Sequence, residues 1–98
     1  MSTQVLFTFF VEYKGGTYTS QIYASSVELA VKKWIADEMA NIAKLSGTSP
    51  LCFEKDFGVE EVVAVKLDQC VNVWCITRSV DGKFLLVNVV ATAEGMAN

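Results

Sequence analysis

The chain has 98 residues and a formal net charge of -3, and 52% of its residues are hydrophobic while 19% are charged. This size predicts a single domain spanning residues 1–98, and no apolar run approaches the roughly 20 residues that a membrane-spanning helix needs. The eight basic residues are scattered, which argues against nucleic acid as a partner because affinity for phosphates rests on clustered Lys and Arg. The first residues lack the basic segment and cleavage pattern of a signal peptide, so we expect a cytoplasmic protein.

An apolar, alternating segment from Val5 to Tyr13 predicts the first strand. The Gly15-Gly16 pair after it can supply the positive φ angles of a two-residue type I′ turn, which joins it to a second strand. With that turn, Phe9 lies opposite Ile22 on one face of the hairpin. The reverse face also carries aromatic side chains, Phe10 among them, so neither face is purely polar.

A helix is predicted to begin near Ser26, because Ser25 and Glu28 have the spacing of a capping box. Gly47 predicts its end, since glycine is common just after the last turn. The apolar residues of this segment recur at helical spacing and form one stripe: Val27, Ala30, Val31, Trp34, Ile35, Ile42 and Leu45.

The connection that follows, residues 46–58, is long for a compact domain and contains the only proline. Three apolar residues in it, Leu51, Phe53 and Phe57, are expected to anchor it by packing. Residues 59–67 then alternate and predict a third strand.

A second hairpin is predicted from two alternating segments, residues 71–78 and 83–93, that flank Asp81-Gly82. This turn places Val73 opposite Val90. Residues 94–98 are expected to form a disordered tail.

The element order β-β-α-β-β-β predicts an α+β fold: a largely antiparallel five-stranded sheet with one helix packed on one face. Such a sheet is about 24 Å wide, whereas one helix covers a width of only about 10–12 Å. Apolar side chains therefore stay uncovered, which is typical of interaction sites. We expect a homodimer, with another protein as the alternative partner. The expected interface lies on the second face of the hairpins and comprises Leu6, Phe10, Tyr23, Val73, Leu86 and Val90.

Glu38 falls within the apolar stripe of the helix, between Trp34 and Ile42. A carboxylate there must be paired or reach solvent, so either the helix overhangs the sheet or Glu38 meets a basic side chain such as Arg78 or Lys66. The alternative is a small-ligand or catalytic pocket between helix and sheet. The residues expected to line that pocket are Glu38, Asn41, Trp34 and Tyr18.

No catalytic residue, cofactor or metal site is predicted. The chain has no histidine, which removes the commonest acid–base side chain near neutral pH and every Ser-His or Cys-His arrangement. Its three cysteines, Cys52, Cys70 and Cys75, lack metal-binding spacing and are expected to be buried or half-buried thiols.

Acidic residues around the predicted third strand have two interpretations. They keep an apolar protein in solution, or they form a recognition patch for a basic partner. The residues of that patch are Glu54, Asp56, Glu60 and Glu61.

The order of strand, glycine turn, strand and capped helix, carried here by Gly15-Gly16 and Ser25, resembles the opening of HicB-type antitoxins. The segment with proline and glycine that this family carries before the helix is absent, and no residue role is transferred. Small acidic immunity proteins, which neutralise bacterial toxins, are similar in size and charge. We therefore expect a small, acidic, non-catalytic protein–protein interaction module of an inhibitor, immunity or antitoxin type, with a small-ligand-binding protein or enzyme as the alternative.

Overall fold

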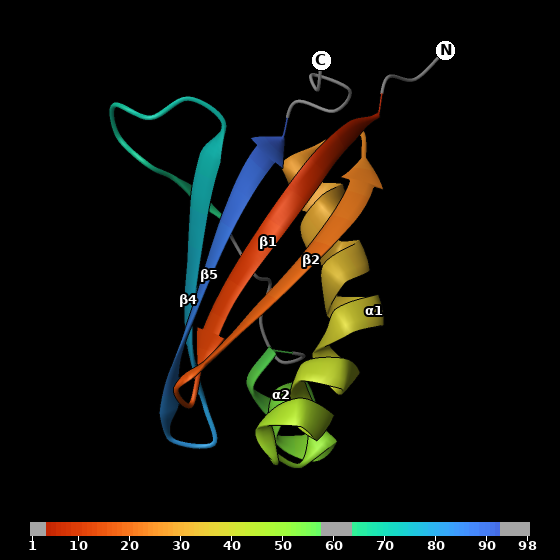
Figure 1. Cartoon of the computed structure of the whole chain (residues 1–98), viewed down its shortest axis with the longest axis vertical. Coiled ribbons are helices and arrows are strands. Elements are labelled where there is room, and N and C mark those ends of the chain that lie inside the picture. The colour runs from red at the N-terminus through yellow and green to blue at the C-terminus, as the bar shows by residue number, and fades with distance from the viewer. Residues whose placement is uncertain (1–3, 58–63, 93–98) are drawn as a thin grey trace.

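The computed structural model describes residues 4–57 and 64–92 and confirms the α+β fold. One antiparallel sheet has the strand order β2-β1-β5-β4-β3, and the helices lie on one side of it (Figure 1). The strands are β1 (Val5–Tyr13), β2 (Gly16–Ala24), β3 (Val65–Lys66), β4 (Val73–Val80) and β5 (Lys83–Thr92), and the helices are α1 (Val27–Ser46) and α2 (Pro50–Phe57). Much of the predicted third strand and the predicted tail at 94–98 fall outside the described residues.

The first hairpin turns one residue earlier than predicted, at Lys14-Gly15 rather than Gly15-Gly16. The two turn residues have φ angles of 51° and 77°. Phe9 consequently lies opposite Ser20 and not Ile22, so the predicted register was wrong by two residues. Because side-chain direction along a strand repeats every two residues, each side chain still lies on its predicted face.

As a residue of β2, Gly16 lies under the ring of Tyr18. A Cβ atom on Gly16 would lie 2.7 Å from the hydroxyl oxygen of Tyr18, whose ring covers the glycine. Gly16 is therefore part of the strand rather than of the turn, and the aromatic ring of Tyr18 covers its backbone. Lys14 in turn adopts a left-handed conformation, which costs an ordinary residue about 1–2 kcal/mol.

The second hairpin has the predicted register. Asp81 and Gly82 form the turn with φ angles of 53° and 72°, and Val73 lies opposite Val90. The C-terminal member of this hairpin, β5, also pairs along its other edge with β1, so β1 and β5 occupy the middle of the sheet.

The cap of α1 lies one residue further along than predicted. Ser26, not Ser25, is the N-cap, and its hydroxyl accepts a hydrogen bond from the backbone N–H of Leu29 at 3.3 Å. The predicted Ser25–Glu28 capping box is therefore wrong, because the third position after the cap is a leucine. The predicted end is confirmed, since Gly47 is the C-cap with a φ of 73°.

The buried stripe of α1 also differs from the prediction near its C-terminal end. Leu45 is 62% exposed, whereas Met39 and Ala43 are buried. The reason is that α2 packs against this part of α1, so the residues of α1 that face α2 are buried as well as those that face the sheet.

Residues 50–57, predicted as part of a loop, form α2. Its start has a recognisable signal, because Ser49 precedes a proline at the first helical position and its hydroxyl accepts the N–H of Leu51 at 3.3 Å. Of the three predicted anchors, Phe53 is buried, and its ring meets that of Tyr13 edge-on with the ring centroids 5.5 Å apart. Leu51 is 70% exposed and anchors nothing, and the side chain of Phe57 lies outside the described residues.

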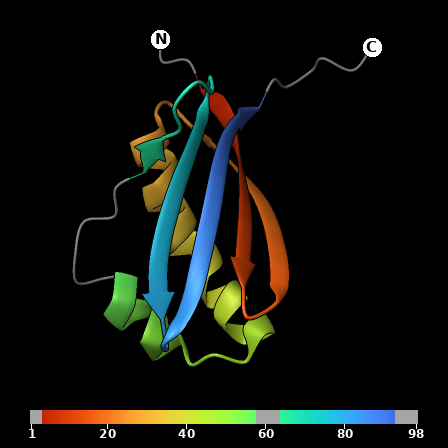
Figure 2. The same ribbon diagram turned by 90° about the vertical axis from the view of Figure 1, so that its left-hand side faces the viewer.

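The core lies between the helices and the sheet face that they cover, as Figure 2 shows from the side of β4 and β5. Trp34 of α1 is fully buried and stacks on Phe9 of β1, with ring centroids 5.5 Å apart and an interplanar angle of 2°. Tyr13, the last residue of β1, is also buried. Its hydroxyl donates to the carbonyl oxygen of Val80 at 2.9 Å and accepts from the hydroxyl of Thr48 at 3.2 Å. This phenol thereby joins β1, β4 and the connection between the helices.

Replacing Tyr13 with phenylalanine should lower the free energy of unfolding by about 1–3 kcal/mol, because the buried Val80 carbonyl loses the phenol donor and the buried Thr48 hydroxyl loses its acceptor and is left with the Ser46 hydroxyl as its partner. Urea unfolding followed by far-UV circular dichroism measures the loss. Tyr18→Phe is the matched control, since the structure gives that half-buried phenol no hydrogen bond to the described residues, and it should change stability by less than about 0.5 kcal/mol. Equal effects in the two variants would contradict the assigned role of Tyr13.

Candidate functional site

One face of the sheet is covered by neither helix. Side chains alternate between two faces along each strand. The residues that alternate with the buried core positions point away from α1 and α2, on the face that we call the open face. All six residues predicted to form an interface lie on it: Leu6, Phe10, Tyr23, Val73, Leu86 and Val90.

The open face combines exposed aromatic residues with half-buried aliphatic ones. Phe10 is 41% exposed, Tyr23 48% and Phe84 66%. Among the strand residues that the structure places on this face, Glu12 is the only charged one. Interface centres are depleted of charge and enriched in aromatic residues, and the open face has both properties.

A polar group of side chains crosses the upper part of the open face. The hydroxyls of Thr8 and Thr92 are hydrogen-bonded to each other, and the Gln21 side-chain amide donates to the Thr8 hydroxyl at 3.1 Å. Thr8 is itself buried by its neighbours. Because the two threonine hydroxyls are already hydrogen-bonded, a partner that covers them does not leave them unpaired.

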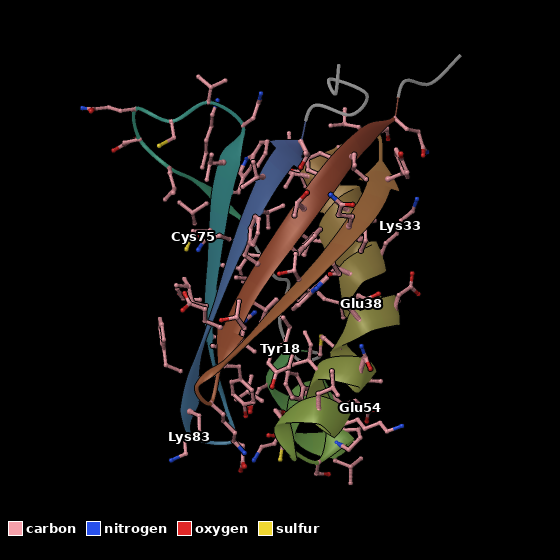
Figure 3. All side chains as sticks on the ribbon, in the orientation of Figure 1. Tyr18, Lys33, Glu38, Glu54, Cys75 and Lys83 are labelled. Carbon is pink, nitrogen blue, oxygen red and sulfur yellow. The ribbon has the colours of Figure 1, made fainter. Side chains whose placement is uncertain are left out.

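A second feature, which we call the edge cleft, lies between α1 and the outer strand β2. It has a volume of about 250 Å³, and Tyr18, Glu38 and Asn41 line it as predicted for a pocket. Figure 3 shows Tyr18 on β2 and Glu38 on α1. Trp34, also predicted there, does not line it, because its ring is stacked on Phe9 inside the core.

Glu38 lies on α1, which runs beside β2, the outer strand of the sheet. It is half-buried and lies beside residues of β2. The suggested basic partners, Arg78 and Lys66, lie in β4 and β3, toward the opposite edge. Since β2 and β4 are about 14 Å apart at the usual strand spacing, Glu38 does not pair with either residue, and the other expectation, a helix end that overhangs the sheet, stays a prediction.

A further hollow, of about 270 Å³, lies between α1 and α2. This hollow was not predicted from the sequence because α2 was not predicted. Ile35, Met39 and Phe53 form its apolar lining, and Glu54 stands at its rim. The Ser49-Pro50 pair is the signal that could have indicated the second helix and hence this hollow. The connection from α2 toward β3 includes residues 58–63, outside the described part of the chain, so no site is assigned to the hollow.

The predicted acidic patch is described only in part. Glu54 is exposed on α2, whereas the Asp56 carboxylate accepts the backbone N–H of Asp81 at 3.1 Å and so fixes α2 to the turn between β4 and β5. Glu60 and Glu61 lie outside the described residues. The patch therefore stays a prediction.

The other predicted features concern cysteines, metals and membranes. Cys52 and Cys75 are half-buried, but Cys70 is exposed in the turn before β4 rather than at least half-buried, as expected. Residues 4–57 and 64–92 contain no group of three side chains that could hold a metal ion. Neither helix in those ranges has the length and hydropathy needed to cross a bilayer.

Comparison with protein-family models, with curated proteins and with solved structures gave no match to this chain. The open face and the edge cleft are therefore the features of this chain that bear on its function.

Proposed function

We propose that this protein is a non-catalytic protein–protein interaction module that forms a homodimer through the open face of its sheet. The observation that carries the proposal is the charge-poor, partly aromatic surface that the described helices leave uncovered. An uncovered sheet face that has exposed aromatic side chains and few charges is typical of a binding surface.

The size of the face is sufficient for a modest dimer. The four long strands, β2, β1, β5 and β4, give a face about 19 Å wide and about 26 Å long, from strand spacing and rise per residue. The projected area is then roughly 500 Å² per chain, or about 1,000 Å² for a pair, which is near the lower limit of specific interfaces. Two such sheets stack about 10 Å apart in β-sandwiches, with side chains of both faces interdigitating.

The distribution of charge permits a second copy as the occupant. Each chain has a net charge of -3, so two copies repel each other weakly overall. The open face avoids this repulsion at the point of contact, since Glu12 is the only charged side chain among its described strand residues. A two-fold axis through the face also brings the same patch of both chains together, as most soluble dimers require.

Measurement of the molar mass in solution tests the proposal. Size-exclusion chromatography with multi-angle light scattering should give twice the 10.8 kDa chain mass at micromolar concentration. Sodium chloride at 0.5 M should leave the dimer intact, because the contact is apolar rather than ionic. A monomer at all concentrations up to about 100 μM, roughly the affinity limit of weak interfaces, would contradict the proposal.

The alternative function, small-ligand binding or catalysis beside Glu38, has less support. The edge cleft holds about 250 Å³, below the roughly 300–1,000 Å³ typical of ligand sites. Half of the residues that line it are consecutive residues of one strand, Thr17 to Ser20. Such a wall suits an extended chain better than a compact molecule.

A further inference from the structure

The outer edge of β2 has backbone groups that point away from the sheet. Tyr13 and Gly16 flank a two-residue turn, so these two residues form a hydrogen-bonded pair. Bonded and non-bonded pairs alternate along an antiparallel ladder. The N–H and C=O groups of Thr17, Thr19 and Gln21 therefore point outward, on the side where β2 has no neighbouring strand in the described part of the chain.

This edge is little protected against another strand. Unpaired edges of natural sheets commonly carry charged residues or proline. The nine residues of β2 include neither. One outward group is occupied, because the Lys33 ammonium of α1 donates to the carbonyl oxygen of Tyr23 at 2.9 Å. The outward groups from Thr17 to Gln21 have no such partner within the described residues.

Helix α1 supplies a second wall beside the unprotected part of the edge. The edge cleft is bounded by Thr17–Ser20 of β2 on one side and by Glu38, Asn41 and Leu45 of α1 on the other. The side chain of Tyr18 lies on the β2 side of this space (Figure 3). A strand added to β2 would therefore run along the helix, with its backbone paired to β2 and alternate side chains facing α1.

We infer that the edge cleft binds an extended segment of a partner protein that adds a strand to β2 and places a basic side chain against Glu38. Among the described residues that line the cleft, Glu38 is the only charged one, and no described basic side chain forms an ion pair with it. Leu45 lies about 10.5 Å further along the helix axis. A side chain two or four residues from the basic one lies on the same face of the added strand and would meet this leucine, so that residue should be apolar.

The β2 strand of a second copy does not fit the edge cleft. Its β2 spans Gly16–Ala24 and contains no basic residue, so pairing two β2 strands would cover Glu38 without neutralising it. The proposed partner of the cleft is therefore a different protein. The cleft shares Thr17 and Thr19 of β2 with the margin of the open face, but peptide affinity and molar mass are separate readouts, so one proposal can fail while the other holds.

Selection of peptides on the full chain tests this inference. A phage-displayed library of random decapeptides is selected on the immobilised protein, and selected sequences are synthesised with capped ends for affinity measurement by fluorescence anisotropy. The enriched peptides should share a basic residue two or four positions from an apolar one. Amide hydrogen exchange at Thr17, Thr19 and Gln21 should slow when such a peptide is added, which needs no variant.

Three variants then locate the binding. Thr19→Pro removes an outward N–H without removing a β1–β2 hydrogen bond, and it should weaken binding by at least ~10-fold, whereas Thr19→Val keeps the N–H and should stay within ~2-fold. Glu38→Gln should weaken binding by about 5–10-fold, and only for peptides that carry the basic residue. The inference is overturned if no peptide is enriched, if Thr19→Pro binds as well as the wild type, or if exchange at the three amides is unchanged.

Discussion

Replacing Phe10 with lysine is expected to convert the proposed dimer into monomers. Phe10 lies in β1, next to the middle of the sheet, and is 41% exposed on the open face. In a two-fold interface the substitution occurs twice. Since removing one buried aromatic side chain from an interface costs about 2 kcal/mol, the dissociation constant should rise roughly 1,000-fold.

The monomer should tolerate this substitution. Glu12 is two residues along the same strand and on the same face, so the introduced lysine has a carboxylate within reach. Sedimentation velocity over a concentration series measures the dissociation constant, and far-UV circular dichroism checks the fold. Leu51→Lys is the matched control, because Leu51 is 70% exposed on α2, on the opposite side of the sheet. The open face is not the contact if Phe10→Lys dimerises as strongly as Leu51→Lys does.

Replacing Trp34 with alanine should cause the largest loss of stability, about 3–5 kcal/mol in the free energy of unfolding. The indole is fully buried, and its removal leaves a cavity and ends the parallel stack on Phe9. Small domains are stable by about 5–15 kcal/mol, so the variant should be partly unfolded or nearly so at 37 °C.

Thermal and urea unfolding at one fixed protein concentration measure this effect, since the proposed dimerisation would make the apparent stability depend on concentration. Trp74→Ala is the comparison, because Trp74 is only half-buried and meets Phe7 edge-on at 6.0 Å. It should lose less than half as much as Trp34→Ala. If the two variants are equally destabilised, the stack of Trp34 on Phe9 does not have the central position in the core that the geometry gives it.

The sheet and the faces of its strands were predictable because they depend on short-range patterns. Alternation of apolar residues defines the strands, and Asp81-Gly82 sets the register of its hairpin correctly. The first hairpin was predicted in the wrong register because two glycines are adjacent there. Only the contact of Gly16 with the Tyr18 hydroxyl shows which of them belongs to the strand, and that contact exists only once the hairpin has formed.

The open face was easier to predict than the edge cleft, because it depends on short-range patterns and the cleft depends on how distant elements pack. Residues of the open face could be grouped because their faces follow from strand alternation alone. Tyr18, Glu38 and Asn41 were placed together, but Trp34 was included because helical spacing cannot distinguish a residue beneath the sheet from one at its edge. Knowledge of the strand order is needed for that distinction, since it identifies β2 as the outer strand.

The order of the strands also determines when the sheet can be completed during synthesis. β1 pairs with β5, whose residues come about 80 positions later in the chain. The first hairpin and α1 can form early from local contacts, but one edge of β1 stays unpaired until the last described strand has been made. During this interval the apolar strand β1 is open to pairing with other chains, so we expect slow translation after β4 to promote aggregation of the nascent protein.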